Sequence, residues 1–99
     1  MKLADFKMIR KDRHQVSSQV LLDFGKYHLS IINGGLLHSG DDNFYEIAVF
    51  DANDGVSTGF VQLPGISEDN DVRDYMAADE VNAVITKLYT ITGQKPVQI

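Results

Sequence analysis

Stretches rich in β-branched and aromatic residues, separated by short turns, occupy the first two thirds of the chain. Residues 16–24 (VSSQVLLDF) and 27–33 (YHLSIIN) are joined by Gly25 and Lys26. Two β-rich runs with a short glycine-containing turn between them predict an antiparallel hairpin. On the second run, alternation places Tyr27, Leu29 and Ile31 on one face and His28, Ser30 and Ile32 on the other.

A second hairpin is predicted immediately downstream. Residues 44–51 (FYEIAVFD) form a strong strand pattern, and residues 56–63 (VSTGFVQL) form its return strand. The turn between them, residues 51–55 (DANDG), contains residue types that tolerate left-handed backbone. One face of the first strand carries Tyr45, Ile47 and Val49, and the other carries Phe44, Glu46, Ala48 and Phe50.

The pattern changes to a helical period near the end of the sequence. Residues 78–92 repeat apolar side chains at helical spacing, at Val81, Val84, Ile85, Leu88 and Ile91. Acidic residues 79–80 favour the helix start through the helix dipole, and Gly93 is the expected stop. Ala77 stands at the N-cap position, where a side-chain oxygen is usual, and Asp74 is a candidate cap for an earlier single turn. Residues 94–99 are expected to be extended and to add an edge strand.

Two hairpins followed by one helix predict an α+β fold, with an antiparallel sheet of about four strands and a C-terminal helix packed on one face. The 99 residues are expected to form a single domain, residues 1–99. Residues 3–9 fit a helical and an extended conformation equally well. Because the helix can cover only one face of the sheet, the other face is open to a partner. That open face carries either Tyr45, Ile47 and Val49 or Phe44 and Phe50, and a second copy of the chain is one candidate partner.

Composition excludes several functional classes. The sequence has no cysteine, which removes disulfides, thiolate zinc sites and cysteine nucleophiles. No apolar run reaches the roughly 18 residues of a membrane span, and the N-terminal residues lack the apolar segment of a signal peptide. The sequence therefore predicts a soluble cytoplasmic protein without membrane association.

Charge is unevenly distributed along the chain. The formal net charge is −5, yet residues 1–26 carry six lysines and arginines against three aspartates. The remaining residues carry Arg73, Lys87 and Lys95 against eleven acidic residues. An acidic surface of this size repels a phosphate backbone, so direct binding of nucleic acid is not expected.

No motif of catalysis, metal binding or cofactor binding is present. The three histidines, His14, His28 and His38, stand in no metal-ligand frame and are expected to be separate surface residues. Residues 51–55 match only part of the start of an EF-hand calcium loop. The loop requires glutamate at its twelfth position, which is Gln62 in this sequence. There is neither a nucleophile elbow nor a glycine-rich phosphate loop. We therefore expect no enzyme, no cofactor and no metal site.

Two acidic loops are the strongest candidates for a functional surface. Residues 67–74 (SEDNDVRD) hold four acids and one arginine, and residues 34–43 end in two aspartates. The residues predicted to bind a partner are Asp41, Asp42, Asp69, Asp71, Asp74 and Tyr75. Carboxylates steer a basic partner, and an aromatic residue anchors it. A weak cation site in residues 67–74 and a purely solvated surface are alternatives. If one of the histidines has a role, it is His38, because Asp41 and Asp42 are close to it in the sequence.

The segments FYEIAVFDANDG (44–55), VQLPG (61–65) and DVRDYMAADEVNAVITKL (71–88) together resemble small early-region proteins of tailed bacteriophages. The resemblance covers roughly residues 27–92 and includes no catalytic signature; Ala77 departs from the usual helix start. It implies a viral product in the cytoplasm of a bacterial host, which inhibits a host factor such as a CRISPR or restriction enzyme by binding it stoichiometrically. Two alternatives stay open: a mimic of nucleic acid that occupies a DNA- or RNA-binding enzyme, and a homodimeric structural or accessory protein.

Overall fold

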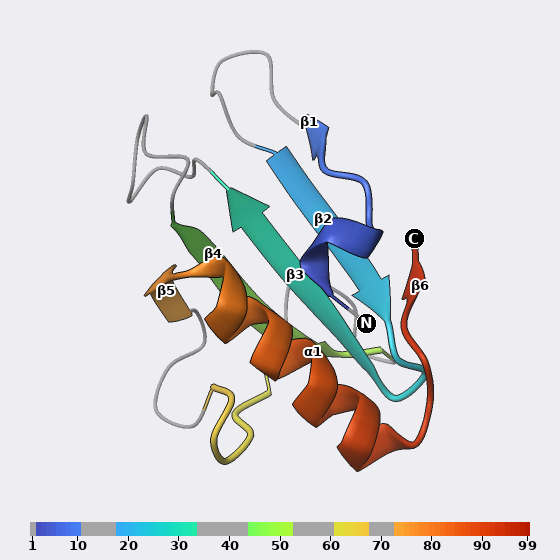
Figure 1. Ribbon diagram of the computed structural model, residues 1–99. Helices are drawn as coiled ribbons and strands as arrows, with labels where there is room; N and C mark the ends of the chain where they lie inside the picture. The colour runs from blue at the N-terminus through green and yellow to red at the C-terminus, as the bar shows by residue number, and fades with distance from the viewer. Residues whose placement is uncertain (1, 11–17, 34–43, 53–60, 68–72) are drawn as a thin grey trace.

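The computed structural model describes residues 2–10, 18–33, 44–52, 61–67 and 73–99. Its elements are the 3₁₀-helix η1 (Leu3–Asp5), the strands β1 (Ile9–Arg10), β2 (Ser18–Asp23), β3 (Tyr27–Asn33), β4 (Tyr45–Asp51), β5 (Arg73–Met76) and β6 (Val97–Gln98), and the helix α1 (Ala78–Thr92). The described strands form one six-stranded antiparallel sheet in the order β1-β2-β3-β4-β5, and β6 also pairs with β2. Helix α1 crosses one face of this sheet (Figure 1). The predicted α+β fold is confirmed.

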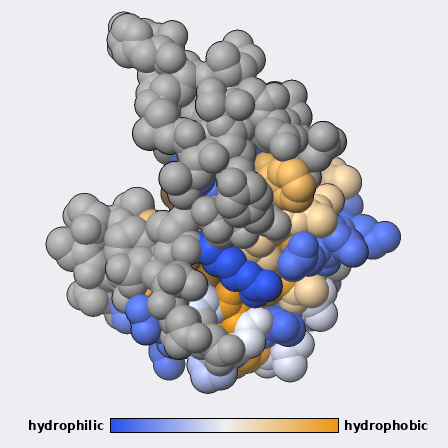
Figure 2. All heavy atoms as spheres, turned by 90° about the vertical axis from the view of Figure 1, so that its left-hand side faces the viewer, coloured by the Kyte–Doolittle hydropathy of each residue, from blue (hydrophilic) through white to orange (hydrophobic). Residues whose placement is uncertain are grey.

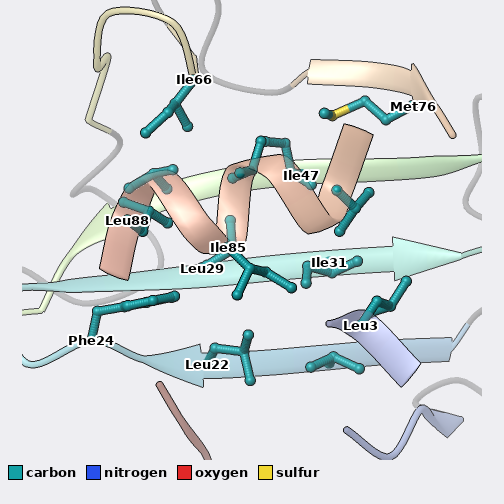
Figure 3. Close-up of a cluster of buried hydrophobic side chains, with 14 residues drawn as sticks. Leu3, Leu22, Phe24, Leu29, Ile31, Ile47, Ile66, Met76, Ile85 and Leu88 are labelled. Atoms are coloured by element: carbon teal, nitrogen blue, oxygen red, sulfur yellow. The ribbon is translucent and has the colours of Figure 1, made fainter. Parts of the chain in front are cut away.

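The core lies between the sheet and α1. Alternate side chains of β2, β3 and β4 meet the apolar stripe of the helix, and residues from η1, β5 and the connections close the ends (Figure 3). The fully buried set comprises Val20, Leu22, Phe24, Leu29, Ile31, Ile47, Val49, Ile66, Met76, Val81, Ile85 and Leu88. The helix therefore covers the face of β4 that carries Ile47 and Val49.

The opposite, outer face of the sheet differs from the expectation. Phe50, proposed as part of an open face, is only 5% exposed, and Ala48 beside it is also buried. Exposed aliphatic residues lie instead at the β1/β6 edge, where Ile9 is 47%, Ile99 58% and Val97 62% exposed. Phe44, the other residue of the expected open face, is half-buried, and the most exposed apolar side chains on this face are at the edge of the sheet.

The predicted bounds of β3 and α1 agree with the structure residue for residue. Gly93 ends the helix in the left-handed conformation, with φ of 68°, and its N–H donates to Tyr89 O at 2.8 Å. Ile91 belongs to the predicted apolar stripe but is exposed, because it lies beyond the end of the core.

The segment between β4 and α1 differs most from its prediction. Residues 61–63 were predicted as part of a return strand but belong to no strand, although Val61 N–H donates to Val49 O at 2.9 Å. Residues 56–60 of that prediction lie outside the described residues. Farther along, Arg73 and Asp74 were predicted in a loop, whereas they begin β5. The pairing of β5 with β4 fixes this extended conformation.

Both ends of the described chain meet at the outer edge of β2. Strand β1 places Ile9 opposite Gln19, and β6 places Gln98 opposite Leu22, so the predicted C-terminal edge strand is confirmed. The Gln98 side chain accepts a hydrogen bond from Lys7 N–H at 2.9 Å and donates one to Lys7 O at 2.5 Å. This side-chain amide joins the two short strands into one edge.

Candidate functional site

Two of the predicted partner-binding residues, Asp74 and Tyr75, lie in β5. Asp74 is therefore part of a strand and does not cap a separate turn as predicted. The other four, Asp41, Asp42, Asp69 and Asp71, lie outside the described residues, as do His14 and His38. The structure thus places the describable part of the candidate site on β5 and its surroundings.

Strand β5 is a bulged edge strand. Its pairing with β4 sets Met76 opposite Tyr45 and Arg73 opposite Ile47, with a register shift between the two pairs. Asp74 and Tyr75 together therefore stand opposite the single residue Glu46, which is the arrangement of a β-bulge. No strand of the described chain pairs with the other side of β5. Bulges bend an edge strand and increase its twist, so they change what the edge presents to a partner.

The basic residues near β5 are bound within the chain. Arg73 donates from Nη1 to Ile66 O at 3.3 Å, and its Nη2 lies 3.7 Å from a carboxylate oxygen of Glu80. Lys87 donates from Nζ to Gly65 O at 2.9 Å. Both cations thus bind carbonyl groups of the 64–67 turn and hold it against β5 and α1. Their positions are set by internal contacts, and Arg73 also follows closely on the acidic sequence of residues 68–71.

The start of α1 adds carboxylates to this end of the molecule. Asp79 and Glu80 are exposed in the first helical turn, next to the end of β5. Glu80 accepts a hydrogen bond from Ala77 N–H at 3.1 Å, and Asp79 accepts one from Glu80 N–H at 3.1 Å. Figure 2 views the molecule from this side and shows hydrophilic and hydrophobic side chains next to one another on the part of the face that is coloured. The described surface here combines a sheet edge with carboxylates.

Glu46 is the functional candidate that sequence reasoning missed. Its Oε1 atom is buried and has no hydrogen-bond partner, the only side-chain oxygen or nitrogen of the described residues in that state. An unpaired buried oxygen is costly, so its presence opposite the bulge of β5 singles Glu46 out among the described residues. The signal was present in the sequence, because Glu46 is the only charged residue within the otherwise apolar run 44–50.

Polar pairs continue along the outer face of the sheet. Gln19 donates from Nε2 to Ser30 Oγ at 2.7 Å, and His28 Nε2 lies 3.5 Å from Asp23 Oδ1. His28 is therefore half-buried beside a carboxylate, in contrast to the predicted isolated surface histidine.

Among the residues that the structure describes, no group of three or more acidic, histidine or cysteine side chains is arranged to hold a metal ion. What β5 offers is an edge with no partner strand in the described chain, next to the exposed carboxylates of Asp79 and Glu80 at the start of α1.

No protein-family model matches the chain, and neither a curated protein nor a solved structure matches it. Within the described ranges, no helix has both the length and the apolar character that crossing a membrane requires. The functional conclusion therefore depends on the site itself.

Proposed function

We propose that the protein is a protein-binding module whose β5 edge receives an extended, basic segment of its partner. One observation carries the proposal: β5 is a bulged edge strand that follows directly on the acidic run of residues 68–71. An edge strand presents N–H and C=O groups with which another chain can pair. Addition of a partner strand to such an edge is a common mode of peptide recognition.

Charge gives this edge its preference for a basic segment. Residues 27–99 hold eleven acidic residues and only three lysines and arginines, and two of those cations are bound to the 64–67 turn. Carboxylates next to the pairing edge accelerate encounter with a positively charged surface and repel an acidic one. In this proposal the backbone of β5 pairs with the partner segment, and the carboxylates of Asp69, Asp71 and Asp74 make the site prefer a basic segment.

The resemblance to early-region phage proteins extends this proposal to a biological setting. In that setting the partner is a host protein with a basic surface, such as a defence enzyme that handles nucleic acid, and the effect is stoichiometric inhibition in the bacterial cytoplasm. The support for this step is the sequence resemblance together with the acidic edge.

The test begins with capture of the partner from bacterial lysate on the tagged protein, washed at low and at high salt. Association rates of the purified pair are then measured for a triple variant, D69N/D71N/D74N. Its matched control, A83K/T86K/T90K, makes the same change in net charge on exposed positions of α1. At low salt we expect the aspartate variant to associate about tenfold more slowly, with the difference shrinking at high salt. The control should change the rate much less.

The location of binding is tested by amide hydrogen exchange on the complex. Pairing of a partner strand with β5 should slow exchange at residues 73–76 more than at any other strand. If both triple variants lost the same fraction of the association rate, the effect would come from net charge and not from the acidic residues at the β5 edge. Protection confined to another surface, with β5 unchanged, would contradict strand addition.

A further inference from the structure

A cavity of about 240 Å³ lies where η1 meets the start of α1, on the helix side of the sheet. It is lined by Lys2, Leu3, Ala4, Phe6, Met8, Tyr45, Ala78 and Asn82. Every lining residue belongs to the described part of the chain, and together they come from the N-terminal segment, β4 and α1. The cavity is distinct from the outer edge of β5.

Most of the residues that line the cavity are apolar. Leu3 is buried in the core, and Phe6, Met8 and Tyr45 pack against that core with part of each side chain still accessible. An enclosed cavity of roughly 150 Å³ with apolar walls is enough to hold a benzene molecule. The cavity here is open to solvent on the side where Lys2, Ala4 and Ala78 are exposed. The larger volume here accommodates an aromatic ring or a branched aliphatic group together with a small polar group.

The polar side chains that line the cavity favour a ligand with a hydrogen-bond acceptor. Asn82 uses its Oδ1 atom to accept a hydrogen bond from Leu3 N–H at 2.7 Å, so its remaining hydrogen-bonding group is the Nδ2 donor. Lys2 has a side chain that only donates. No aspartate or glutamate is among the lining residues, although Asp5 lies in the same 3₁₀-helix and accepts a hydrogen bond from Lys2 N–H at 2.8 Å.

We propose that this cavity binds a small carboxylate that carries an aromatic or branched aliphatic body. The body lies against Phe6 and Met8, and the carboxylate receives hydrogen bonds from the Lys2 ammonium group and the Asn82 amide. Charge-assisted hydrogen bonds to a carboxylate are about twice as strong as neutral ones. A cavity lined by donors in a protein with net charge −5 therefore selects anions that the rest of the surface repels.

The proposal is tested by titrating the isotope-labelled protein with 3-phenylpropanoate and following backbone amide signals by NMR. A ligand of this size should bind with a Kd of about 1 mM. The largest shifts are expected at Ala4, Met8, Ala78 and Asn82. The matched probe, 3-phenylpropanamide, has the same shape without the charge and should bind at least about fivefold more weakly, because the charge-assisted hydrogen bonds are lost.

Substitutions separate the charge from the cavity. Lys2→Gln should weaken binding of the acid about fivefold and leave binding of the amide unchanged, whereas Lys95→Gln, beyond the far end of α1, should change neither. Ala4→Phe should fill the cavity and abolish binding of both probes. Shifts centred elsewhere, equal affinity for acid and amide, or equal effects of the two lysine variants would each overturn the proposal. If a variant fails to fold, the comparison of the acid and the amide on the wild-type protein still tests the proposal. Neither probe involves the partner protein of the β5 edge, so this test is independent of the proposed function.

Discussion

Ser67 shows how a single hydroxyl group can fix a connection. Its side chain is only 2% exposed, and it lies in the 61–67 segment between β4 and β5. The Oγ atom donates to Val61 O at 2.9 Å and accepts from Leu63 N–H at 3.1 Å. Without the hydroxyl group, the Val61 carbonyl and the Leu63 N–H would each lose this hydrogen bond. The segment therefore keeps its shape, although it contains no regular secondary structure.

Replacing Ser67 by alanine should lower the free energy of unfolding by about 2 kcal/mol, because it removes two hydrogen bonds at a buried position. The control is Thr90→Ala, which removes a hydrogen bond from Oγ1 to Thr86 O on the exposed side of α1. That change should cost less than about 0.5 kcal/mol. Urea denaturation of both variants measures the difference. Equal costs for the two variants would show that the buried hydroxyl group is not what holds the turn.

Among the elements, α1 has an incomplete N-terminus. Glu80 accepts a hydrogen bond from Ala77 N–H, which is half of a capping box. Ala77 has the extended backbone of an N-cap residue, with φ of −74° and ψ of 161°, but makes no side-chain hydrogen bond. A serine at this position has the conformation it needs to complete the box.

Ala77→Ser should therefore raise the free energy of unfolding by about 0.5–1 kcal/mol. Ala83→Ser, on the exposed middle of the same helix, should lower it slightly, because serine is a poorer helix former than alanine. Thermal and urea denaturation give both values. A lower midpoint for the Ala77 variant would place the helix start elsewhere.

The elements also differ in how well the sequence predicts them. Helix α1 and strand β3 have apolar residues at the period of their own secondary structure, so their bounds are visible without tertiary information. Strand β5 has only four residues, and its bulge disrupts the alternation that identifies a strand. Its conformation depends on β4, which lies more than twenty residues earlier in the chain.

The same limit applies to the candidate site. Asp74 and Tyr75 were found from acidity and aromatic character, and both lie on the sheet edge. The binding of Arg73 and Lys87 to the 64–67 turn was not predictable, because these contacts join residues 7 and 22 positions apart. The cavity at η1 was also missed, since it is formed by three segments that lie far apart in the sequence.

For the whole molecule, the two faces of the sheet contribute unequally to stability. Leu22 faces α1 and is fully buried, whereas Leu21, its neighbour on β2, faces outward and is half-buried. The hydrophobic core thus lies on one side, and the outer face becomes exposed toward the β1/β6 edge.

This asymmetry predicts different costs for adjacent truncations. Leu22→Ala should lower the free energy of unfolding by about 3 kcal/mol, because it leaves a cavity in the core. Leu21→Ala should cost about 1 kcal/mol, since a partly exposed side chain loses less buried area. Chemical denaturation of the two variants compares them directly. A larger loss for Leu21 would reverse the assignment of the core face.

The hydrogen bonds between Gln98 and Lys7 have a consequence for the order of folding. They join residues 91 positions apart, and Ile99 N–H completes the same edge by donating to Leu21 O at 2.9 Å. Closing so long a loop costs entropy, and the edge consists of two strands of two residues each, so we expect it to form last and to open first. Native-state hydrogen exchange should therefore show Lys7 and Ile99 exchanging through local opening, well before Leu29 and Ile31 in β3.

Chains halted before residue 97 would then have a folded helix and hairpin with the β2 edge still unpaired by β6, which is the state most prone to pair with a neighbouring chain.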